Sequence, residues 1–364
     1  MKRVVIDARC LLTGIGTYTL NLVRGLKSFG DFHLRALTLE AHKDTLHPFC
    51  DEVDVVNAPI YSFREQVEIA RAAHPCDLLH VPHYNAPLLH RGTMLVSIHD
   101  LTHILDDSFR STWKSRIYAQ PMLRMAASNA DHIFTVSEYS KRQIIEHLDV
   151  HSDKVTVVYN GVSPQFFPEA RDDARRSTGS RHGFEGPYLL YVGNLKPHKN
   201  VAGLLRAFAL ARSRGGVAHK LLVVGNDVTG RPQMMTLAKE LGLNGSAVFV
   251  PSVSVESLRT IYSGADLTIL PSFEEGFGLP IVESMACGTP VSCSSAASMP
   301  EVGGDAAAYF DPAKFESIAH VMEQVLSSPE RMREMRELGI AQAARFTWES
   351  CARKHYDVYR GYLN

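Results

Sequence analysis

The chain has 364 residues, of which 45% are hydrophobic and 21% are charged, a composition that excludes an intrinsically disordered protein. Lys and Arg total 38 while Asp and Glu total 39, so no excess of positive charge points to nucleic acid as a partner. The length suits two domains better than one.

The sequence also bears on the compartment. The first ten residues form a strand-like run that contains Asp7 and Arg9, which is unlike a signal peptide. No apolar run reaches the roughly 18 residues that a membrane-spanning helix needs. The six cysteines form no C-x-x-C pair and no spacing typical of a metal site. We therefore expect a protein of the reducing cytoplasm.

Short apolar runs alternate with longer helical patterns along nearly the whole chain. In the first half, strands are predicted over 4–6, 34–39, 53–56, 78–81, 95–98, 133–136 and 155–158, and helices over 17–28, 65–73, 112–128 and 138–147. In the second half, strands are predicted over 188–192, 221–224, 247–250, 267–270 and 290–293. This alternation is typical of parallel sheets covered by helices, so the predicted fold class is α/β with doubly wound sheets.

The boundary between the two domains is predicted in the segment 163–186, which is rich in Pro, Arg, Asp, Ser and Gly and has no clear period. The segment is interpreted as a linker with a short irregular helix. We accordingly expect an N-terminal domain over 1–165, a linker over 166–186, a C-terminal domain over 187–345 and a terminal helix over 346–364.

The loop and helix after the apolar run 266–270 carry the most functional information. The loop holds Gly276 and Gly278, and the helix has Pro280 near its first position and Gly288 just past its end. A strand, a glycine loop and a helix N-terminus present unpaired backbone N–H groups and the positive end of the helix dipole. Together they make a ready site for an anion.

Two carboxylates flank this anion site, Glu275 in the loop and Glu283 in the helix. Carboxylates repel phosphate but accept hydrogen bonds from hydroxyl groups. The combination suits a ligand with phosphate in its middle and polyols at both ends, which is the shape of a nucleotide sugar. The alternative is an ordinary connection between a strand and a helix, with two glutamates that face solvent.

The stretch 270–291 closely resembles the Glu-x7-Glu motif of the large retaining glycosyltransferase family 4. The similarity includes Glu275 and Glu283 and continues into the residues that follow. Other stretches agree with the family in the expected order: 14–18, 97–101, 136–141, 159–162, 192–200 and 299–306. The resemblance implies the GT-B fold, in which two Rossmann-like domains face a central cleft and the terminal helix returns to the N-terminal domain.

The same resemblance assigns the donor side of the site to the C-terminal domain. Lys199 would bind the donor diphosphate, Glu283 would accept hydrogen bonds from ribose, and Glu275 would hold a hydroxyl of the transferred sugar. Where the family often has an arginine, this chain has Asn194 with Lys196 nearby, so the second phosphate contact stays open. The expected donor contacts in this domain are Asn194, Lys196, Lys199, Gly276, Phe277, Gly278, Leu279 and Glu283.

The N-terminal domain would supply the other wall. By resemblance, Gly14 and Gly16 let the backbone approach the diphosphate, and His99 contacts the donor sugar or its leaving diphosphate. A structural role at the end of a strand is the alternative for His99. The expected catalytic residues are therefore His99, Lys199 and Glu275.

No metal and no other cofactor is expected. The histidines at 80, 83, 90 and 103 have spacings that fit no zinc pattern and lack a cysteine partner. The sequence also has no convincing D-x-D in a suitable loop. Positive charges and dipoles would then stabilise the departing diphosphate.

The resemblance implies an enzyme that moves a hexose from a nucleoside-diphosphate sugar to a glycan or lipid-linked acceptor. The pattern looks most like bacterial mannosyltransferases that build O-antigen or exopolysaccharide, which favours GDP-mannose as donor. A UDP-sugar donor, a sugar-nucleotide epimerase of the same architecture and a non-catalytic nucleotide-sugar sensor are the alternatives.

The segment 112–125 has two interpretations. It could contact anionic lipid head groups or a lipid-linked acceptor at the inner face of the membrane. It could also be an exposed basic helix over the core. The residues on which both interpretations depend are Trp113, Lys114, Arg116, Tyr118 and Arg124.

Overall fold

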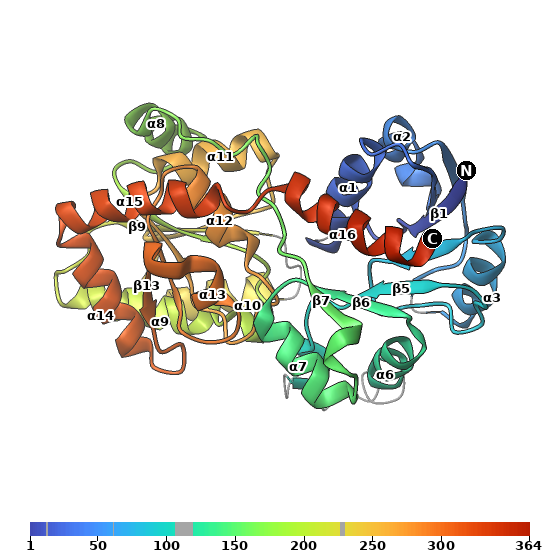
Figure 1. Cartoon of the computed structure of the whole chain (residues 1–364). Coiled ribbons are helices and arrows are strands. Elements are labelled where there is room, and N and C mark those ends of the chain that lie inside the picture. The colour runs from blue at the N-terminus through green and yellow to red at the C-terminus, as the bar shows by residue number, and fades with distance from the viewer. Residues whose placement is uncertain (12–13, 61, 106–118, 226–229) are drawn as a thin grey trace. The chain divides into compact units, whose positions relative to one another are not determined.

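The computed structural model forms two compact units (Figure 1). Unit 1 comprises Met1–Gly161 and Thr347–Asn364, and unit 2 comprises Val162–Phe346. Each unit contains one parallel β-sheet with helices, which confirms the α/β class with two Rossmann-like units. The structure describes all residues except 12–13, 61, 106–118 and 226–229.

Unit 1 is built on a parallel sheet that has seven strands in the described part of the chain. The strands are β1 (Lys2–Asp7), β2 (Phe32–Thr38), β3 (Glu52–Val55), β4 (Leu78–Val81), β5 (Met94–Ser97), β6 (His132–Thr135) and β7 (Val155–Val157). Its helices are α1 (Gly14–Lys27), α2 (Lys43–Leu46), α3 (Phe63–Ala72), α4 (Thr102–Leu105), α6 (Gln120–Asn129), α7 (Glu138–Leu148) and α16 (Trp348–Leu363).

The strand order β3-β2-β1-β4-β5-β6-β7 contains one reversal. The chain runs outward from β1 to β3 and then restarts on the other side of β1 with β4, which pairs with β1 in parallel. The topological switch point of unit 1 therefore lies between β1 and β4. In open parallel sheets, ligands bind outside the carboxyl ends of the strands at such a point.

Unit 2 repeats this plan with a sheet of six strands among the described residues. The strands are β8 (Tyr188–Val192), β9 (Lys220–Val224), β10 (Ala247–Val250), β11 (Leu267–Leu270), β12 (Val291–Ser294) and β13 (Ala307–Phe310). Its helices are α8 (Arg171–His182), α9 (Val201–Ser213), α10 (Gly230–Glu240), α11 (Val255–Gly264), α12 (Leu279–Ala286), α13 (Met299–Gly303), α14 (Phe315–Leu326) and α15 (Pro329–Ala343). The order β10-β9-β8-β11-β12-β13 puts the switch point between β8 and β11.

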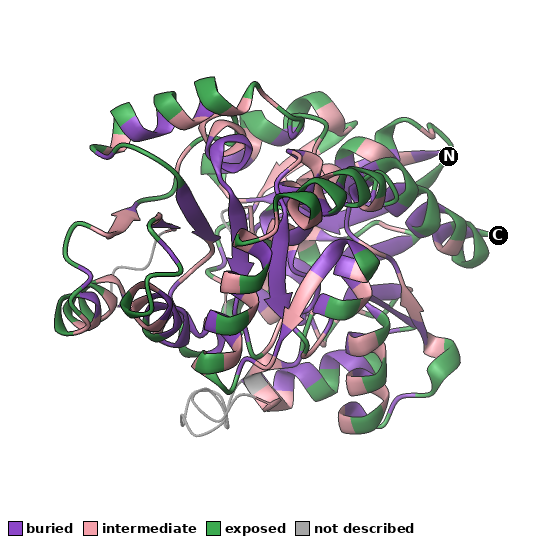
Figure 2. Ribbon diagram, turned by 90° about the vertical axis from the view of Figure 1, so that its left-hand side faces the viewer, coloured by how far each residue is buried: buried purple, intermediate pink, exposed green. Residues whose placement is uncertain are grey.

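The strands are apolar because helices cover both faces of each sheet. Val4, Val5 and Ile6 of β1 are fully buried, as are Leu221 and Leu222 of β9. Figure 2 shows central strands in purple, for buried, and many helices that are green along one side. Such sheets have continuous apolar strands rather than alternating ones.

Helix α16 belongs to unit 1, although the whole of unit 2 precedes it in the chain. It packs against α1, and Figure 1 shows the two helices side by side. A Cβ atom at Gly25 would lie 2.3 Å from the Cβ of Ala352, so this close approach requires glycine at Gly25. In the described part of the chain, no helix combines the length and apolar character that crossing a bilayer would take.

The segment 166–186, expected as a linker, is instead part of unit 2, and the division between the units falls at Gly161 and Val162. Its helix α8 packs against α11 and is also anchored by polar contacts. Arg175 pairs with Asp266 at 2.7 Å and donates to the carbonyl oxygen of Gly264. A helix anchored in this way has a weak apolar period, so the sequence predicted only a short irregular helix here, within a linker.

Other boundaries also differ from the sequence expectations. Helix α1 begins at Gly14, so Gly14 and Gly16 lie in its first turn rather than in a loop before it. Strand β13 was not predicted. Most of the segment 112–125 lies outside the described residues, and of its basic side chains only Arg124, exposed on α6, is described.

Candidate active site

Two loops meet at the switch point of unit 2. One follows β8 and carries Lys199, and the other follows β11 and carries Glu275. The Nζ atom of Lys199 lies 2.6 Å from Oε1 of Glu275, and the side chains are only 16% and 14% exposed. The structure thus brings together two of the three predicted catalytic residues as a shielded ion pair.

Asn200 joins the same two loops. Its side-chain amide donates to the carbonyl oxygens of Pro271 at 3.1 Å and Pro312 at 2.8 Å, and its Oδ1 caps α9 at Gly203. Its backbone is in the left-handed region, which asparagine tolerates better than most residues. Asn200 was not among the predicted site residues, although an asparagine directly before a helix is a recognisable capping signal.

Glu275 is oriented from two further directions. The hydroxyl of Ser272 donates to Oε1 at 3.0 Å, and the hydroxyl of Ser298 donates to the backbone oxygen of Glu275 at 2.9 Å. The sequence analysis did not identify either serine. Their contacts hold both the loop and its carboxylate in place.

Helix α12 begins beside this loop. Gly278 is its N-cap with φ of 87°, a left-handed conformation that favours glycine, and no side chain caps the first turn. Gly276 and Phe277 are buried, and the ring of Phe277 lies edge-on against Phe346. Leu279, the first helical residue, is partly buried. The predicted helix N-terminus, a suitable anion site, is therefore present.

Glu283 lies in the second turn of α12 and is partly buried. Burial raises the pKa of its carboxyl group to about 7, although the hydroxyl of Tyr262, which donates to Oε2 at 3.0 Å, acts in the opposite direction. The group is therefore close to half ionised at neutral pH and can accept hydrogen bonds from hydroxyl groups.

Asn194 and Lys196 occupy the loop after β8. The side-chain oxygen of Asn194 accepts the backbone N–H of Lys196 at 3.2 Å, so Asn194 shapes the loop. Lys196 is exposed. Of the two residues near the position where the family often has arginine, Lys196 is thus the one that presents a positive charge to solvent.

In unit 1, His99 follows β5. Its Nε2 lies 3.0 Å from the carbonyl oxygen of Pro82, which can only accept, so Nε2 carries the proton. Burial lowers the pKa of His99 below its usual value, which favours the neutral ring. Nδ1 of His99 is then a hydrogen-bond acceptor, suited to a hydroxyl group rather than to a phosphate.

Tyr18 of α1 lies behind His99, with ring centroids 4.7 Å apart in an edge-to-face arrangement. The Tyr18 hydroxyl lies 2.6 Å from Nε2 of His355 and 2.8 Å from the hydroxyl of Ser97. Because Nδ1 of His355 faces the carbonyl oxygen of Cys351 at 2.8 Å, Nδ1 carries the proton and Nε2 accepts. Tyr18 therefore donates to His355, and Ser97 donates to Tyr18.

His80 continues this buried chain of hydrogen bonds. Since the hydroxyl proton of Ser97 points to Tyr18, Nε2–H of His80 donates to Ser97 at 2.8 Å, and Tyr359 donates to Nδ1 of His80. Burial keeps the pKa of His80 well below its usual value. These hydrogen bonds all run in one direction, and they connect α16 to Tyr18, whose ring lies against His99. None of these links was predicted.

The two N-terminal glycines have different surroundings. A Cβ atom at Gly16 would lie 2.2 Å from the backbone of Leu11, so this glycine serves internal packing. A Cβ atom at Gly14 would meet nothing within 4 Å, and Gly14 is exposed. Of the pair, Gly14 is the one that leaves room for a ligand. That Gly14, Gly16 and His99 contact the same donor as the residues of unit 2 stays a prediction from the family resemblance.

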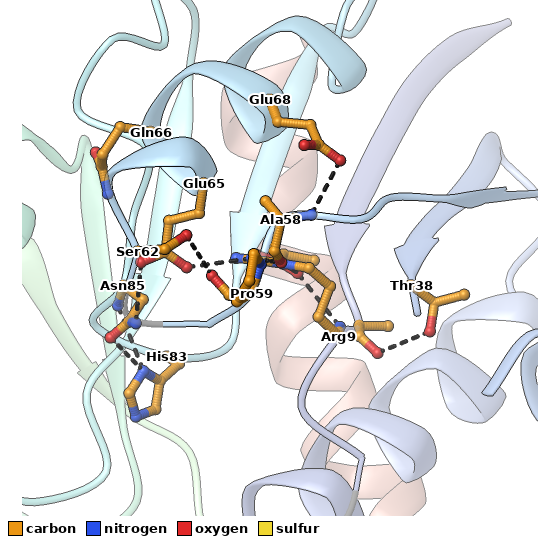
Figure 3. A network of polar contacts seen from close by, with 12 residues as sticks. Arg9, Thr38, Ala58, Pro59, Ser62, Glu65, Gln66, Glu68, His83 and Asn85 are labelled. Atoms are coloured by element: carbon orange, nitrogen blue, oxygen red, sulfur yellow. Dashed lines mark hydrogen bonds and ion pairs between the residues drawn. The ribbon is translucent and has the colours of Figure 1, made fainter. Parts of the chain in front are cut away.

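A second polar network occupies the switch point of unit 1 (Figure 3). The guanidinium of Arg9 makes two hydrogen bonds to the carboxylate of Asp7, at 2.8 and 2.7 Å, and a third to Glu65 at 3.1 Å. The side chain of Asn85 connects Glu65 to His83. The partners come from distant parts of the sequence, which gave no signal for the network.

No group of three or more His, Cys, Asp or Glu side chains is arranged to hold a metal ion within the residues that the structure describes. His80, one of the histidines considered for a metal in the sequence, uses both ring nitrogens in the hydrogen bonds above.

Comparison with known families identifies both units. Residues 12–166 match the model described as Glycosyltransferase Family 4, and residues 172–342 match the model described as Glycosyl transferases group 1. Together the two matches cover most of the chain.

Individual relatives agree with these matches. The chain is 28% identical to the O-antigen chain mannosyltransferase B of Escherichia coli, over 96% of both sequences. It is 27% identical to a D-inositol 3-phosphate glycosyltransferase of Corynebacterium aurimucosum, over 76% of this chain and 66% of that protein. The solved structure of sucrose-phosphate synthase from Thermosynechococcus elongatus superimposes with a TM-score of 0.82 at 19% identity, covering 99% of both chains, which shows the shared fold.

Proposed function

The chain belongs to the family 4 glycosyltransferases, and on that premise we propose that it transfers mannose from GDP-mannose to a glycan or lipid-linked acceptor, with retention of the anomeric configuration. The similarity to a mannosyltransferase over nearly the full length of both chains supports the choice of sugar. The assignment of the donor site is supported by the Lys199–Glu275 pair, which lies beside the N-terminus of α12 at the switch point of unit 2.

In this proposal, the diphosphate lies against the first turn of α12 and the ammonium group of Lys199. An ammonium group has three N–H donors, so Lys199 can keep its hydrogen bond to Glu275 while it donates to phosphate oxygens. The carboxylate of Glu275 then accepts a hydrogen bond from a hydroxyl of the mannose. Glu283 accepts hydrogen bonds from the ribose.

The positive charge of Lys199 and the dipole of α12 stabilise the departing GDP, so the proposed reaction needs no divalent ion. His99 contacts the sugar or the leaving diphosphate, and Nδ1 is the atom that accepts. The leaving phosphate helps to deprotonate the acceptor hydroxyl on the same face of the sugar. The proposed location is the cytoplasm, at the inner face of the membrane when the acceptor is lipid-linked.

Calorimetry with GDP, UDP and ADP, and with their mannose and glucose conjugates, tests the donor site. The proposal expects GDP and GDP-mannose to bind most tightly, with the same affinity in EDTA and in Mg²⁺. Preference for uridine nucleotides would replace GDP-mannose by a UDP-sugar. Binding of no nucleotide would overturn the assignment of the site.

Turnover separates a transferase from an epimerase. The enzyme is incubated with GDP-mannose and a mannose-terminated oligosaccharide, and the product is analysed by NMR. A new α-linked mannose would support the proposal, because the donor is α-linked. A changed sugar nucleotide without an acceptor-dependent product would instead support the epimerase.

A further inference from the structure

A cluster of three arginines lies at the amino edge of the sheet in unit 2. Arg171 and Arg175 come from α8, and Arg336 comes from α15. Both arginines of α8 pair with Oδ1 of Asp266, the residue directly before β11. The proposed donor loop follows the opposite end of this strand, about 15 Å away at the rise of an extended chain. The cluster is therefore separate from the proposed donor site.

The charges of this cluster do not balance. In the described part of the chain, Asp266 is the acid that pairs with these arginines, so three guanidinium groups face one carboxylate. His219 adds no charge near neutral pH: its Nε2 lies 3.2 Å from Oδ2 of Asp266, and burial beside two arginines lowers its pKa to about 4. Asp172 lies near Arg171, but it is exposed to water, which weakens its effect. Without Asp172, the cluster has a net charge of plus two.

Arg336 shows the imbalance most clearly. No carboxylate forms an ion pair with it among the residues that the structure describes, and its Nε is buried without a hydrogen-bond partner. Burial and the charge of Arg175 lower the pKa of Arg336. Burial, followed by the charges of Arg336 and Arg175, lowers the pKa of Arg171 to about 10. Like charges held this close repel one another, and an anion between them would remove the repulsion.

The cluster also has hydrogen-bond donors to offer. Arg175 uses Nε and Nη2 for Gly264 and Asp266, which leaves Nη1 without a partner in the described residues. Both Nη groups of Arg336 are likewise unpaired there, and unlike its Nε they are not enclosed by protein. Guanidinium groups suit phosphate oxygens, because their N–H donors form a flat fork.

A surface groove of about 1010 Å³ adjoins the cluster at Arg175. Arg176 and Lys220 are further basic residues in its described lining, and Asp172 and Glu185 are the acids. Ligand pockets have volumes of this order. The groove therefore gives the cluster an opening to solvent and room for an organic group beside a bound anion.

From these observations we propose that Arg171, Arg175 and Arg336 bind a phosphate dianion, either free phosphate or the phosphate of a small monoester whose organic part lies in the groove. Near neutral pH such a group carries about two negative charges, which match the surplus of the cluster. A carboxylate or a phosphodiester, with one charge, leaves part of that surplus uncompensated. The inference does not depend on the proposed function, because the cluster and the donor loop lie at opposite edges of the sheet.

Calorimetry on the full-length Lys199→Ala variant tests the site, because this background removes the cation of the proposed donor site. The probes are inorganic phosphate, glycerol 3-phosphate and, as an uncharged control, glycerol. Phosphate and glycerol 3-phosphate are expected to bind, and glycerol is not. Tighter binding of glycerol 3-phosphate would assign the organic part to the groove, whereas equal affinities would assign the site to free phosphate. Binding of neither anion would overturn the inference.

Arg336→Gln, made in the same background, tests the cluster directly. It should weaken phosphate binding by about 10-fold, the order expected when one charge-assisted hydrogen bond is lost. The matched control is Arg333→Gln, which removes the same charge from an exposed position of the same helix. The control should retain the affinity of its parent. Equal affinities in Arg336→Gln and Arg333→Gln would contradict the proposal.

Thermal unfolding separates ligand binding from a purely structural role. Phosphate at about ten times its Kd should raise the unfolding midpoint of the parent by roughly 3 °C and that of Arg336→Gln by much less. Without phosphate, Arg336→Gln should unfold at the parent's midpoint or above it, since repulsion between the arginines is relieved. A lower midpoint without phosphate would mean that Arg336 only holds the fold together. Nucleotide binding is measured separately, and its failure would overturn the proposed function while leaving this result unaffected.

Discussion

Lys199 and Glu275 form an ion pair, with 2.6 Å between Nζ and Oε1. They come from the two loops that flank the switch point of unit 2, and Asn200 connects those loops through its hydrogen bond to Pro271. In the proposed function, the pair offers a cation to the diphosphate and a carboxylate to a hydroxyl group of the sugar. Preorganisation of this kind avoids reorganisation during the reaction.

Substitution of the two residues should have different effects. Glu275→Ala is expected to lower kcat by about 100-fold, the order seen when a preorganised polar contact is lost, while GDP binds nearly as before. Lys199→Ala should weaken GDP binding as well, because its proposed partner is the diphosphate. The measurements are steady-state kinetics and calorimetry with GDP.

A matched control is Lys314→Ala, which removes a lysine from an exposed pair with Asp311 at 3.1 Å. Exposed pairs contribute little, so both kcat and GDP affinity should stay at the wild-type level. Small and equal effects in Lys199→Ala and Glu275→Ala would show that the two roles are wrongly assigned.

The pKa of Glu283 predicts a pH dependence of nucleotide binding. Burial raises this pKa from 4.5 to about 7, so the carboxyl group is protonated below that pH and ionised above it. Hydrogen bonds to an ionised acceptor are the stronger ones. The affinity for GDP should therefore rise between pH 6 and pH 8, and Glu283→Gln should remove that part of the rise.

The comparison with Glu283→Gln is essential, because GDP itself changes its ionisation in the same range. Calorimetry at several pH values gives the difference between the two proteins. Parallel pH profiles for wild type and variant would mean that Glu283 does not accept hydrogen bonds from the nucleotide.

Tyr18 should act as a positioning residue for His99. His99→Ala removes the proposed contact to the sugar and is expected to reduce kcat. Tyr18→Leu removes the ring that lies against His99, and it should reduce kcat with little change in the KM for donor. Tyr18→Phe keeps the ring and should retain more activity, although it leaves His355 and Ser97 without their partner.

The nitrogen NMR signals of His99 distinguish positioning from general destabilisation. In the wild type they should report a proton on Nε2, and in Tyr18→Leu the signals should broaden or shift toward a mixture of tautomers. An unchanged spectrum together with a reduced kcat would rule out this route of action.

Buried histidines make the free energy of unfolding depend on pH. Burial lowers the pKa of His355 to about 3, against 6.5 in the unfolded chain. Below about pH 6.5 the unfolded chain therefore binds one more proton, and the free energy of unfolding falls by about 1.4 kcal/mol per pH unit down to about pH 3. Above pH 6.5 this contribution does not change with pH.

Urea unfolding at pH 7 and pH 5 measures the effect. His355→Gln should lose less stability than the wild type between these pH values, whatever its stability at pH 7. His80 shares the neutral, buried state, so the wild type should show a loss larger than one histidine explains. The same loss in both proteins would contradict this account.

Features that depend on local backbone geometry could be predicted from the sequence. Gly278 and Gly288 have the left-handed conformations that the beginning and end of α12 require, and apolar runs between helical patterns were sufficient to predict two doubly wound parallel sheets. The family resemblance, which depends on such short stretches, is confirmed. The roles of Glu275, Glu283 and Lys199 stay predictions, with a geometry that suits them.

The tertiary structure alone decided which polar groups meet. Arg9, Glu65 and Asn85 come from separate segments, as do Tyr18 and His355, and each is buried with a partner that no local pattern indicates. The contact between Arg175 of α8 and Asp266 could not be predicted from the sequence for the same reason. Local sequence reports the conformation of the backbone, whereas the partner of a buried charge or ring nitrogen depends on how the strands are ordered in the sheet.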